Sequence, residues 1–245
     1  MRRSARRIAE LDDADFDRLL LVLRWLEANP QSGLYIRQLP VRGVDTKWVS
    51  THRGLVEELF AALTGLESLG LGAPPVLVRM RFLDPQLSPG GLVDVSAPVP
   101  ELAALDIQPR TVFVFENLES VIAMPPVPGA VVLHGAGYAV DRLERIPWVR
   151  DGRVVYWGDL DSHGFGILNR IRSACSNVSA VLMDSETLEA YRDLWVKEPV
   201  PSTGTFNHLL PAEQQMVEHL GRQGNVRLEQ ERIEWRYALE QLLTR

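Results

Sequence analysis

Four apolar residues run directly into an acidic loop bounded by glycines in Val154-Val-Tyr-Trp-Gly-Asp-Leu-Asp-Ser-His-Gly164. A short unbroken run of β-branched and aromatic residues is typical of a buried strand. Gly158 and Gly164 let the backbone approach other groups closely, because glycine has no Cβ. The stretch therefore predicts a buried strand whose carboxyl end presents two acidic side chains, Asp159 and Asp161.

Strands and helices alternate on both sides of this stretch. Apolar runs predict further strands at 112–115, 130–133 and 178–183, and helical periodicity predicts helices at 117–124, 138–145, 164–174 and 185–194. The chain then closes with a loop at 196–210 and helices at 211–220 and 228–243. Because such alternation produces a parallel sheet with helices on its faces, we predict an α/β domain with a four-stranded parallel sheet flanked by helices.

The first part of the chain has a different pattern. Acidic residues from Asp12 to Asp15 suit the start of a helix that runs to Ala28, and a second helix is predicted at 46–63, after a short strand at 34–36. This order is compatible with a winged-helix-like α+β domain and equally with three-helix arrangements.

A stretch rich in Gly and Pro, residues 65–75, is a candidate linker between the two parts. After it, residues 76–83 and 92–95 predict two strands joined through the Gly90-Gly91 turn. We therefore place the domain boundaries at 1–72 and 73–245.

Composition excludes several classes of protein. The 245 residues are 46% hydrophobic and 24% charged, which excludes a wholly disordered chain, a collagen-like fibre and a coiled-coil rod. The net charge of −6 gives no overall basic excess, although a local basic face remains compatible with it. The single cysteine, Cys175, excludes an internal disulfide and a multi-cysteine zinc site. No apolar run approaches the roughly 18 residues that span a bilayer, so we expect a cytoplasmic protein without membrane contact.

Each predicted strand of the parallel sheet ends at polar residues. These are Glu116-Asn117, His134-Gly135, Asp159 with Asp161, and Asp184. Ligands bind at the carboxyl ends of parallel strands, and hard divalent cations take a few carboxylates together with water and phosphate oxygens. Glu116, Asp159 and Asp161 are therefore candidate ligands for Mg²⁺ or Mn²⁺, although acidic residues at strand ends are also ordinary helix N-caps.

Phe115-Glu-Asn117 together with Gly158-Asp-Leu-Asp-Ser-His-Gly164 resembles a Toprim domain, the metal-binding fold shared by topoisomerases, DnaG-type primases and certain nucleases. The Gly-Asp-x-Asp-x-x-Gly form is similar to the topoisomerase VI A subunit branch. A wider set of motifs resembles the JetD nuclease subunits of the Wadjet anti-plasmid system. It adds Pro125-Pro-Val-Pro-Gly129, Gly135-Ala-Gly-Tyr138, Tyr35-Ile-Arg-Gln-Leu39 and Gly43-Val-Asp-Thr-Lys-Trp48 with His52-Arg53. The similarity spans roughly residues 30–195.

The resemblance implies a winged-helix domain of the catabolite-activator type (CAP-like), which binds DNA, followed by a catalytic Toprim domain. It also implies a homodimer that cuts double-stranded circular plasmid DNA beside an SMC-type Wadjet complex. By position, Glu116, Asp159 and Asp161 carry over as the metal-binding acids.

The expected activity is metal-dependent hydrolysis of DNA by an endonuclease. Mg²⁺ or Mn²⁺ held by the three acids would bind the scissile phosphate and activate a water, and Glu116 serves either as a ligand or as a general base. His163 contacts phosphate, assists proton transfer, or is a plain surface histidine. Topoisomerase relatives use a tyrosine nucleophile, for which the N-terminal part offers only Tyr35, on a predicted strand. Hydrolysis by water is therefore favoured over a topoisomerase VI-like transesterase.

A local basic excess marks the N-terminal domain. Arg37, Arg42, Lys47 and Arg53 are opposed within residues 37–53 only by Asp45. These side chains either track DNA phosphates or form a solvated helix face. A non-catalytic DNA-binding and dimerisation module is the other function class that fits, but the intact acidic trio argues against it.

Overall fold

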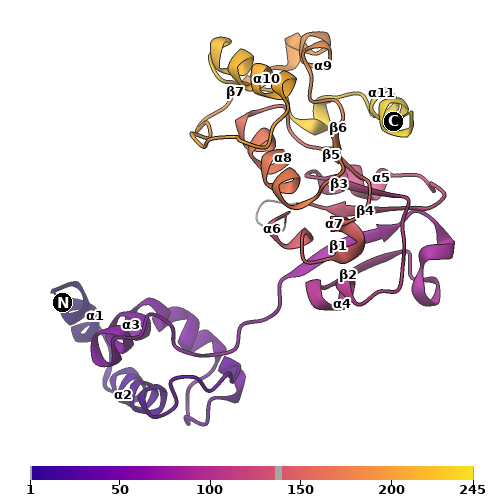
Figure 1. The fold of residues 1–245 in the computed structure, drawn as a ribbon. Helices are drawn as coiled ribbons and strands as arrows, with labels where there is room; N and C mark the ends of the chain where they lie inside the picture. Colours follow the sequence, from indigo (N-terminus) through magenta and orange to yellow (C-terminus); the bar gives the residue numbers. More distant parts are fainter. Residues whose placement is uncertain (1, 136–139, 245) are drawn as a thin grey trace. The chain divides into compact units, whose positions relative to one another are not determined.

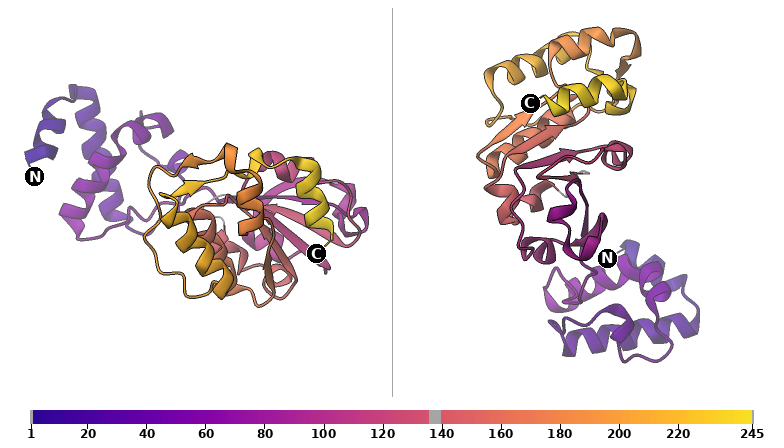
Figure 2. Two further views of the ribbon diagram at one scale, coloured as in Figure 1. Left: turned by 90° about the horizontal axis from the view of Figure 1, so that it is seen from above. Right: turned by 90° about the vertical axis from the view of Figure 1, so that its right-hand side faces the viewer.

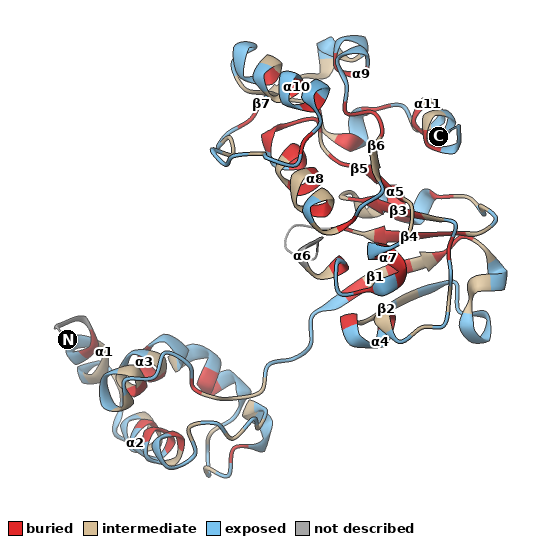
Figure 3. Ribbon diagram, viewed as in Figure 1, coloured by how far each residue is buried: buried red, intermediate tan, exposed pale blue. Residues whose placement is uncertain are grey.

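The computed structural model describes residues 2–135 and 140–244 (Figure 1). The chain forms two compact units, residues 1–75 and 76–245. Each unit has its own cluster of buried apolar side chains, which Figure 3 shows as red segments within both. Each unit is therefore stabilised by a core of its own.

The N-terminal unit is built from helices α1 (Arg2–Ala9), α2 (Asp13–Ala28) and α3 (Thr46–Thr64). Asp12 and Asp45 cap α2 and α3, since their side chains accept hydrogen bonds from the N–H groups of Asp15 and Trp48. The apolar faces of α2 and α3 pack together, with Leu26 and Phe60 almost wholly buried. The two helices predicted here are confirmed, and α1 adds a third.

The short strand expected at 34–36 is wrong. Tyr35 pairs with Gly72 in a single parallel bridge, and the chain then enters the 3₁₀ turn η1 (Ile36–Gln38). The N–H of Tyr35 donates to the Gln38 side chain, which closes the turn at the point where a strand would have to continue. Among residues 2–75 this bridge is the one β pairing, and the β-hairpin that would form a wing is not among them.

A six-stranded sheet forms the centre of the second unit. Its strands are β1 (Leu77–Phe82), β2 (Asp94–Pro98), β3 (Thr111–Phe115), β4 (Ala130–His134), β5 (Val154–Trp157) and β6 (Val178–Ala180), in the order β2-β1-β4-β3-β5-β6. The predicted four-stranded parallel sheet is confirmed as β4-β3-β5-β6. The predicted hairpin, β1 and β2, joins it through an antiparallel pairing of β1 with β4.

Helices cover both faces of this sheet (Figures 1 and 2). They are α4 (Val99–Ala103), α5 (Leu118–Ala123), α6 (Val140–Leu143), α7 (Pro147–Arg150), α8 (Ser162–Ala174), α9 (Ser185–Ala190), α10 (Pro211–Arg222) and α11 (Trp235–Leu243). Side chains alternate along β5, so Tyr156 reaches α8 through the Gly164 carbonyl while Trp157 stacks on Trp235 of α11. Both rings are fully buried, and β5 is thus covered on each side.

Several predicted elements begin or end in other places, and helix α9, for example, ends at Ala190 rather than at residue 194. Strand β6 stops at Ala180 rather than at residue 183, because Leu182 has a φ of +62°, which an extended strand cannot contain. The helix predicted at 228–243 begins only at Trp235. Its expected first part instead holds Leu228, which pairs with Leu160, and the 3₁₀ turn η6 (Gln230–Arg232). Just before it, β8 (Val226–Arg227) pairs with β7 (Val196–Lys197), which lies in the stretch predicted as a loop at 196–210.

Candidate active site

The carboxyl ends of β3 and β5 lie side by side. Phe115 and Trp157, the last residues of these strands, are register partners, and the N–H of Glu116 donates to the Trp157 carbonyl over 3.4 Å. Glu116 and the loop that carries Asp159 and Asp161 therefore begin at adjacent positions on one edge of the sheet. The parallel pairing thus brings together acids that are more than forty residues apart in the chain.

Glu116 is a largely buried carboxyl group in a negative environment. Burial raises its pKa from 4.5 to about 7, and the charges of Asp159 and Asp161 act in the same direction. A hydrogen bond from the Tyr156 hydroxyl to Glu116 Oε1 opposes this rise. Burial and the nearby carboxylates raise the pKa of Tyr156 well above its usual value, so the phenol stays protonated and acts as a donor.

Asp159 has a similar environment. Burial raises its pKa, and the negative charge of Asp161 adds to the effect. Its Oδ1 accepts a hydrogen bond from the Gln230 N–H over 2.8 Å, which partly offsets the rise. Arg227 acts on Asp159 as a smaller, opposing positive charge, and the pKa values of both Glu116 and Asp159 remain raised, so a cation would stabilise both ionised forms.

Asp161 is wholly buried and already has two partners. Its Oδ1 caps α8 by accepting from the Gly164 N–H over 2.8 Å, and its Oδ2 lies 2.5 Å from Arg227 Nε. The N-cap alternative weighed from the sequence therefore holds for this residue. Its carboxylate is satisfied by a helix terminus and a guanidinium.

The two glycines of the loop are required by close packing. A Cβ on Gly158 would overlap both Glu116 Oε1 and the Tyr156 hydroxyl, and a Cβ on Gly164 would overlap the Asp159 carbonyl oxygen. Neither glycine has a positive φ, so space and not backbone conformation excludes a side chain. This confirms the close backbone approach expected at both positions.

Residues 226–231, here called the C-terminal strap, form a wall of the site that sequence analysis missed. Leu228 pairs with Leu160 through two backbone hydrogen bonds of 2.9 and 3.2 Å. Gln230 links two strand ends, because its N–H donates to Asp159 while its Oε1 accepts from the Asn117 N–H. The signal that could have indicated the strap is Gly224-Asn225, a turn pair in which both residues have positive φ.

The donor set determines what the site can bind. No group of three His, Cys, Asp or Glu side chains among the described residues is arranged to hold a metal ion. Mg²⁺, however, is commonly bound through one or two carboxylates, several waters and substrate phosphates. Glu116 and Asp159, whose ionised forms are disfavoured by burial and by neighbouring negative charge, fit such a hydrated ion, whereas the Asp161 carboxylate is held by Arg227.

Comparison with known families identifies the chain. Residues 70–242 match the family described as Wadjet protein JetD, C-terminal, and residues 1–61 match one described as an uncharacterized protein conserved in bacteria, N-term. The chain belongs to the Wadjet JetD family. The three acids and the C-terminal strap all lie within the JetD match. No curated protein was found to match the chain.

In this JetD family member the histidines near the acids have different surroundings. His134 lies at the end of β4, and its Nε2 is 2.9 Å from the Glu116 carbonyl oxygen, so it fixes the backbone of the site. His163 is about half exposed, and its Nε2 is 2.7 Å from the Val200 carbonyl and 3.7 Å from Glu198 Oε1. His163 thus contacts the 198–202 loop and none of the three acids.

Two further polar residues that follow strands act as helix N-caps. Asn117 caps α5 by accepting from the Ser120 N–H and also donates to Glu231 of the strap. Asp184 caps α9 by accepting from the Thr187 N–H. Gly137 and Tyr138 of the sequence motif lie outside the described residues.

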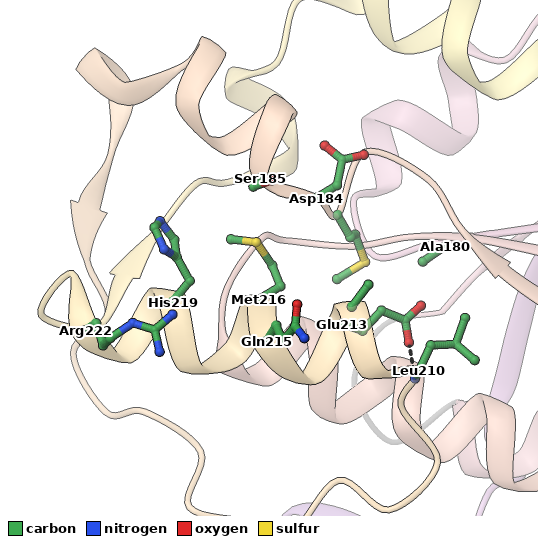
Figure 4. Close-up of a pocket in the computed structure, with 11 residues that line it drawn as sticks. Ala180, Asp184, Ser185, Leu210, Glu213, Gln215, Met216, His219 and Arg222 are labelled. Atoms are coloured by element: carbon green, nitrogen blue, oxygen red, sulfur yellow. Dashed lines mark hydrogen bonds between the residues drawn. The ribbon is translucent and has the colours of Figure 1, made fainter.

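A separate pocket of about 510 Å³ lies between the start of α9 and helix α10 (Figure 4). Met216 and His219 of α10 line it opposite Asp184 and Ser185. None of the three acids reaches it. The candidate chemistry therefore lies at the strand ends and not in this pocket.

The four basic residues of this JetD family member's N-terminal unit that were predicted to contact DNA are exposed. Arg37 lies in η1, Arg42 in the following loop, and Lys47 and Arg53 on α3. Arg53 Nε forms an ion pair with Glu57 over 2.8 Å. The other three have no ion pair among the described residues, and their charges face solvent.

Proposed function

We propose that this JetD family member is a divalent-metal-dependent DNA endonuclease of the Toprim class. It hydrolyses circular plasmid DNA as a homodimer beside the SMC-type complex of a Wadjet defence system. The observation that carries this proposal is the pair Glu116 and Asp159, two carboxyl groups with raised pKa values at the adjacent ends of β3 and β5. Membership of the Wadjet JetD family supports the defence role.

Glu116 and Asp159 would hold Mg²⁺ or Mn²⁺, which supplies charge neutralisation at the scissile phosphate and acidifies a water. Tyr156 orients Glu116 by donating to Oε1, and the Gln230 N–H orients Asp159. Glu116, with a pKa of about 7, is also suited to accept a proton from the attacking water. Asp161 fixes the loop through its cap on α8.

Water is the proposed nucleophile. Tyr156 contacts Glu116, but it is fully buried and its pKa is raised well above the usual value, so its phenolate is inaccessible. Tyr35 lies in the N-terminal unit, at the start of η1. These observations favour hydrolysis over formation of a covalent tyrosyl–DNA adduct.

Cleavage of supercoiled plasmid tests the proposal. The purified chain is incubated with Mn²⁺, Mg²⁺ or EDTA, and Asp159→Asn is compared with Asp151→Asn, which removes an exposed acid paired with Arg150. We expect metal-dependent nicking or linearisation that D159N reduces by about a hundredfold or more and that D151N leaves unchanged. Equal cleavage by both variants would locate the activity elsewhere. Absence of both cleavage and Mn²⁺ binding in the parent chain would overturn the proposal.

A further inference from the structure

One cation already lies beside Asp161, the third acid of the candidate site. Arg227 of β8 places its Nε 2.5 Å from Asp161 Oδ2, and its Nη1 is 3.6 Å from Glu229. The charge of Asp159 also acts on it. Among the described residues, Arg227 is the positively charged partner of Asp161.

The two partners differ in their access to solvent. The Asp161 side chain is 1% exposed, whereas that of Arg227 is 27% exposed. The ion pair between Arg172 and Glu213 in the same unit is less accessible to solvent, because its side chains are 13% and 11% exposed. Arg172 also donates to two carbonyl oxygens. Arg227 thus keeps an open side from which a ligand can approach it.

We propose that Arg227 competes with the divalent cation for Asp161, and that it moves from Asp161 to a DNA phosphate when DNA binds. This inference rests on the proposed nuclease function. A guanidinium and a metal ion are both cations, so each weakens the binding of the other to one carboxylate. Guanidinium groups bind phosphate with two parallel hydrogen bonds, so a phosphodiester is a suitable alternative partner for Arg227.

Movement of Arg227 from Asp161 to a phosphate would couple metal binding to DNA binding. DNA that draws Arg227 away leaves Asp161 available, so DNA and metal increase the affinity of the protein for each other. The strap that carries Arg227 also holds Asp159 through Gln230, so a shift of this segment reaches two of the three acids. Arg227 is in these terms a positioning residue, since it acts through Asp161.

Mn²⁺ affinity of the full chain, measured by calorimetry without DNA, tests the competition. We expect Arg227→Gln to bind Mn²⁺ about tenfold more tightly than the parent, because it releases Asp161. Arg232→Gln is the matched control, since Arg232 lies next to the strap and pairs with Glu229 but does not touch Asp161. R232Q should stay within about twofold of the parent, and equal effects of R227Q and R232Q would show a general charge effect and overturn the competition.

A double variant and a measurement in the presence of DNA make the test specific. The gain in R227Q should disappear in R227Q/D161N, because the gain depends on Asp161. A short DNA duplex should raise the Mn²⁺ affinity of the parent about tenfold more than that of R227Q, because direct contact of a phosphate with the metal is common to both proteins; an equal rise in both would overturn the exchange. Should R227Q fail to fold, Arg227→Lys decides, since its ammonium lacks the guanidinium fork and should lose the additional DNA-dependent rise.

The outcomes separate this inference from the proposed function. Metal-dependent cleavage that D159N abolishes, combined with unchanged Mn²⁺ affinity in R227Q, would overturn the role of Arg227 and leave the nuclease intact. A parent chain that neither binds Mn²⁺ nor cleaves DNA would overturn both.

Discussion

Glu116 combines a buried position with a place beside two other carboxyl groups. Its neighbours within the second unit are the Tyr156 hydroxyl, which donates to it, and the charges of Asp159 and Asp161, which oppose its ionisation. Carboxyl groups whose pKa is raised by burial and by neighbouring negative charge are frequent in functional sites. The residue therefore links protonation, metal binding and stability.

The raised pKa of Glu116 predicts a pH-dependent stability of the metal-free protein. Because the folded-state pKa, about 7, lies above the ordinary 4.5, the stabilisation is complete below about pH 4.5 and is lost as the pH rises through 7. We expect the free energy of unfolding in EDTA to fall between pH 5 and pH 8 by about 2 kcal/mol more in the parent than in Glu116→Gln. Urea unfolding at both pH values checks this, and parallel falls would contradict it.

Helix α8 is the element that joins the acidic loop to the sheet. Asp161 caps its start, Ser162 donates through Oγ to the buried Glu198, and Gly164 packs on the Asp159 carbonyl. The last of these contacts leaves no room for a side chain. The start of the helix and the loop geometry therefore depend on each other.

Alanine substitutions at two glycines of α8 separate packing from helix propensity. Gly164→Ala should cost about 2–4 kcal/mol, because its Cβ would overlap the Asp159 carbonyl. Gly166→Ala is the control, since the nearest atom to its Cβ would lie in the Phe206 ring, at 3.4 Å, and alanine favours a helix by up to about 1 kcal/mol. Urea unfolding of both variants gives the comparison. A G164A variant as stable as G166A would show that the loop rearranges freely.

At the scale of the whole molecule, the chain consists of two units with separate cores. The N-terminal unit carries the four exposed basic residues predicted to contact DNA, and the second unit carries the three acids of the candidate site. Separate cores allow substitutions in one unit without loss of packing in the other. The contribution of the N-terminal basic residues to DNA binding and the metal affinity without DNA can therefore be tested with separate variants.

Removal of basic residues in the N-terminal unit should weaken DNA binding. Arg42→Gln with Lys47→Gln removes two exposed charges, so the affinity for duplex DNA should fall about equally for unrelated sequences, and the salt dependence should become shallower by roughly 0.9 per lost phosphate contact. Mn²⁺ affinity should stay unchanged. Arg150→Gln, at an exposed ion pair of the second unit, is the control. Fluorescence anisotropy at several salt concentrations measures the effect, and unchanged binding would exclude these residues from the DNA contact.

Much of the fold was predictable because apolar runs and helix-capping residues are local patterns of the sequence. Apolar runs identified β3, β4 and β5 to within a residue at each end, and acidic or amide caps such as Asp12 and Asn117 marked the starts of helices. The helix predicted from residue 228 was wrong in its first part, because Leu228 pairs with Leu160 across the fold and a 3₁₀ turn follows before α11 begins at Trp235. The positive φ of Leu182 could not be predicted from the sequence, since residues other than glycine rarely adopt such a φ.

The parallel sheet and the set of acids at its edge follow from the amino-acid sequence, because chain order and strand polarity place Glu116, Asp159 and Asp161 together. How each acid is held depends on the folded chain. Arg227 is 66 residues from Asp161, and Gln230 is 71 residues from Asp159. Contacts over such separations depend on packing against the complete sheet, and no local pattern encodes them. The partners that set the charge of the site were therefore invisible until the chain was folded.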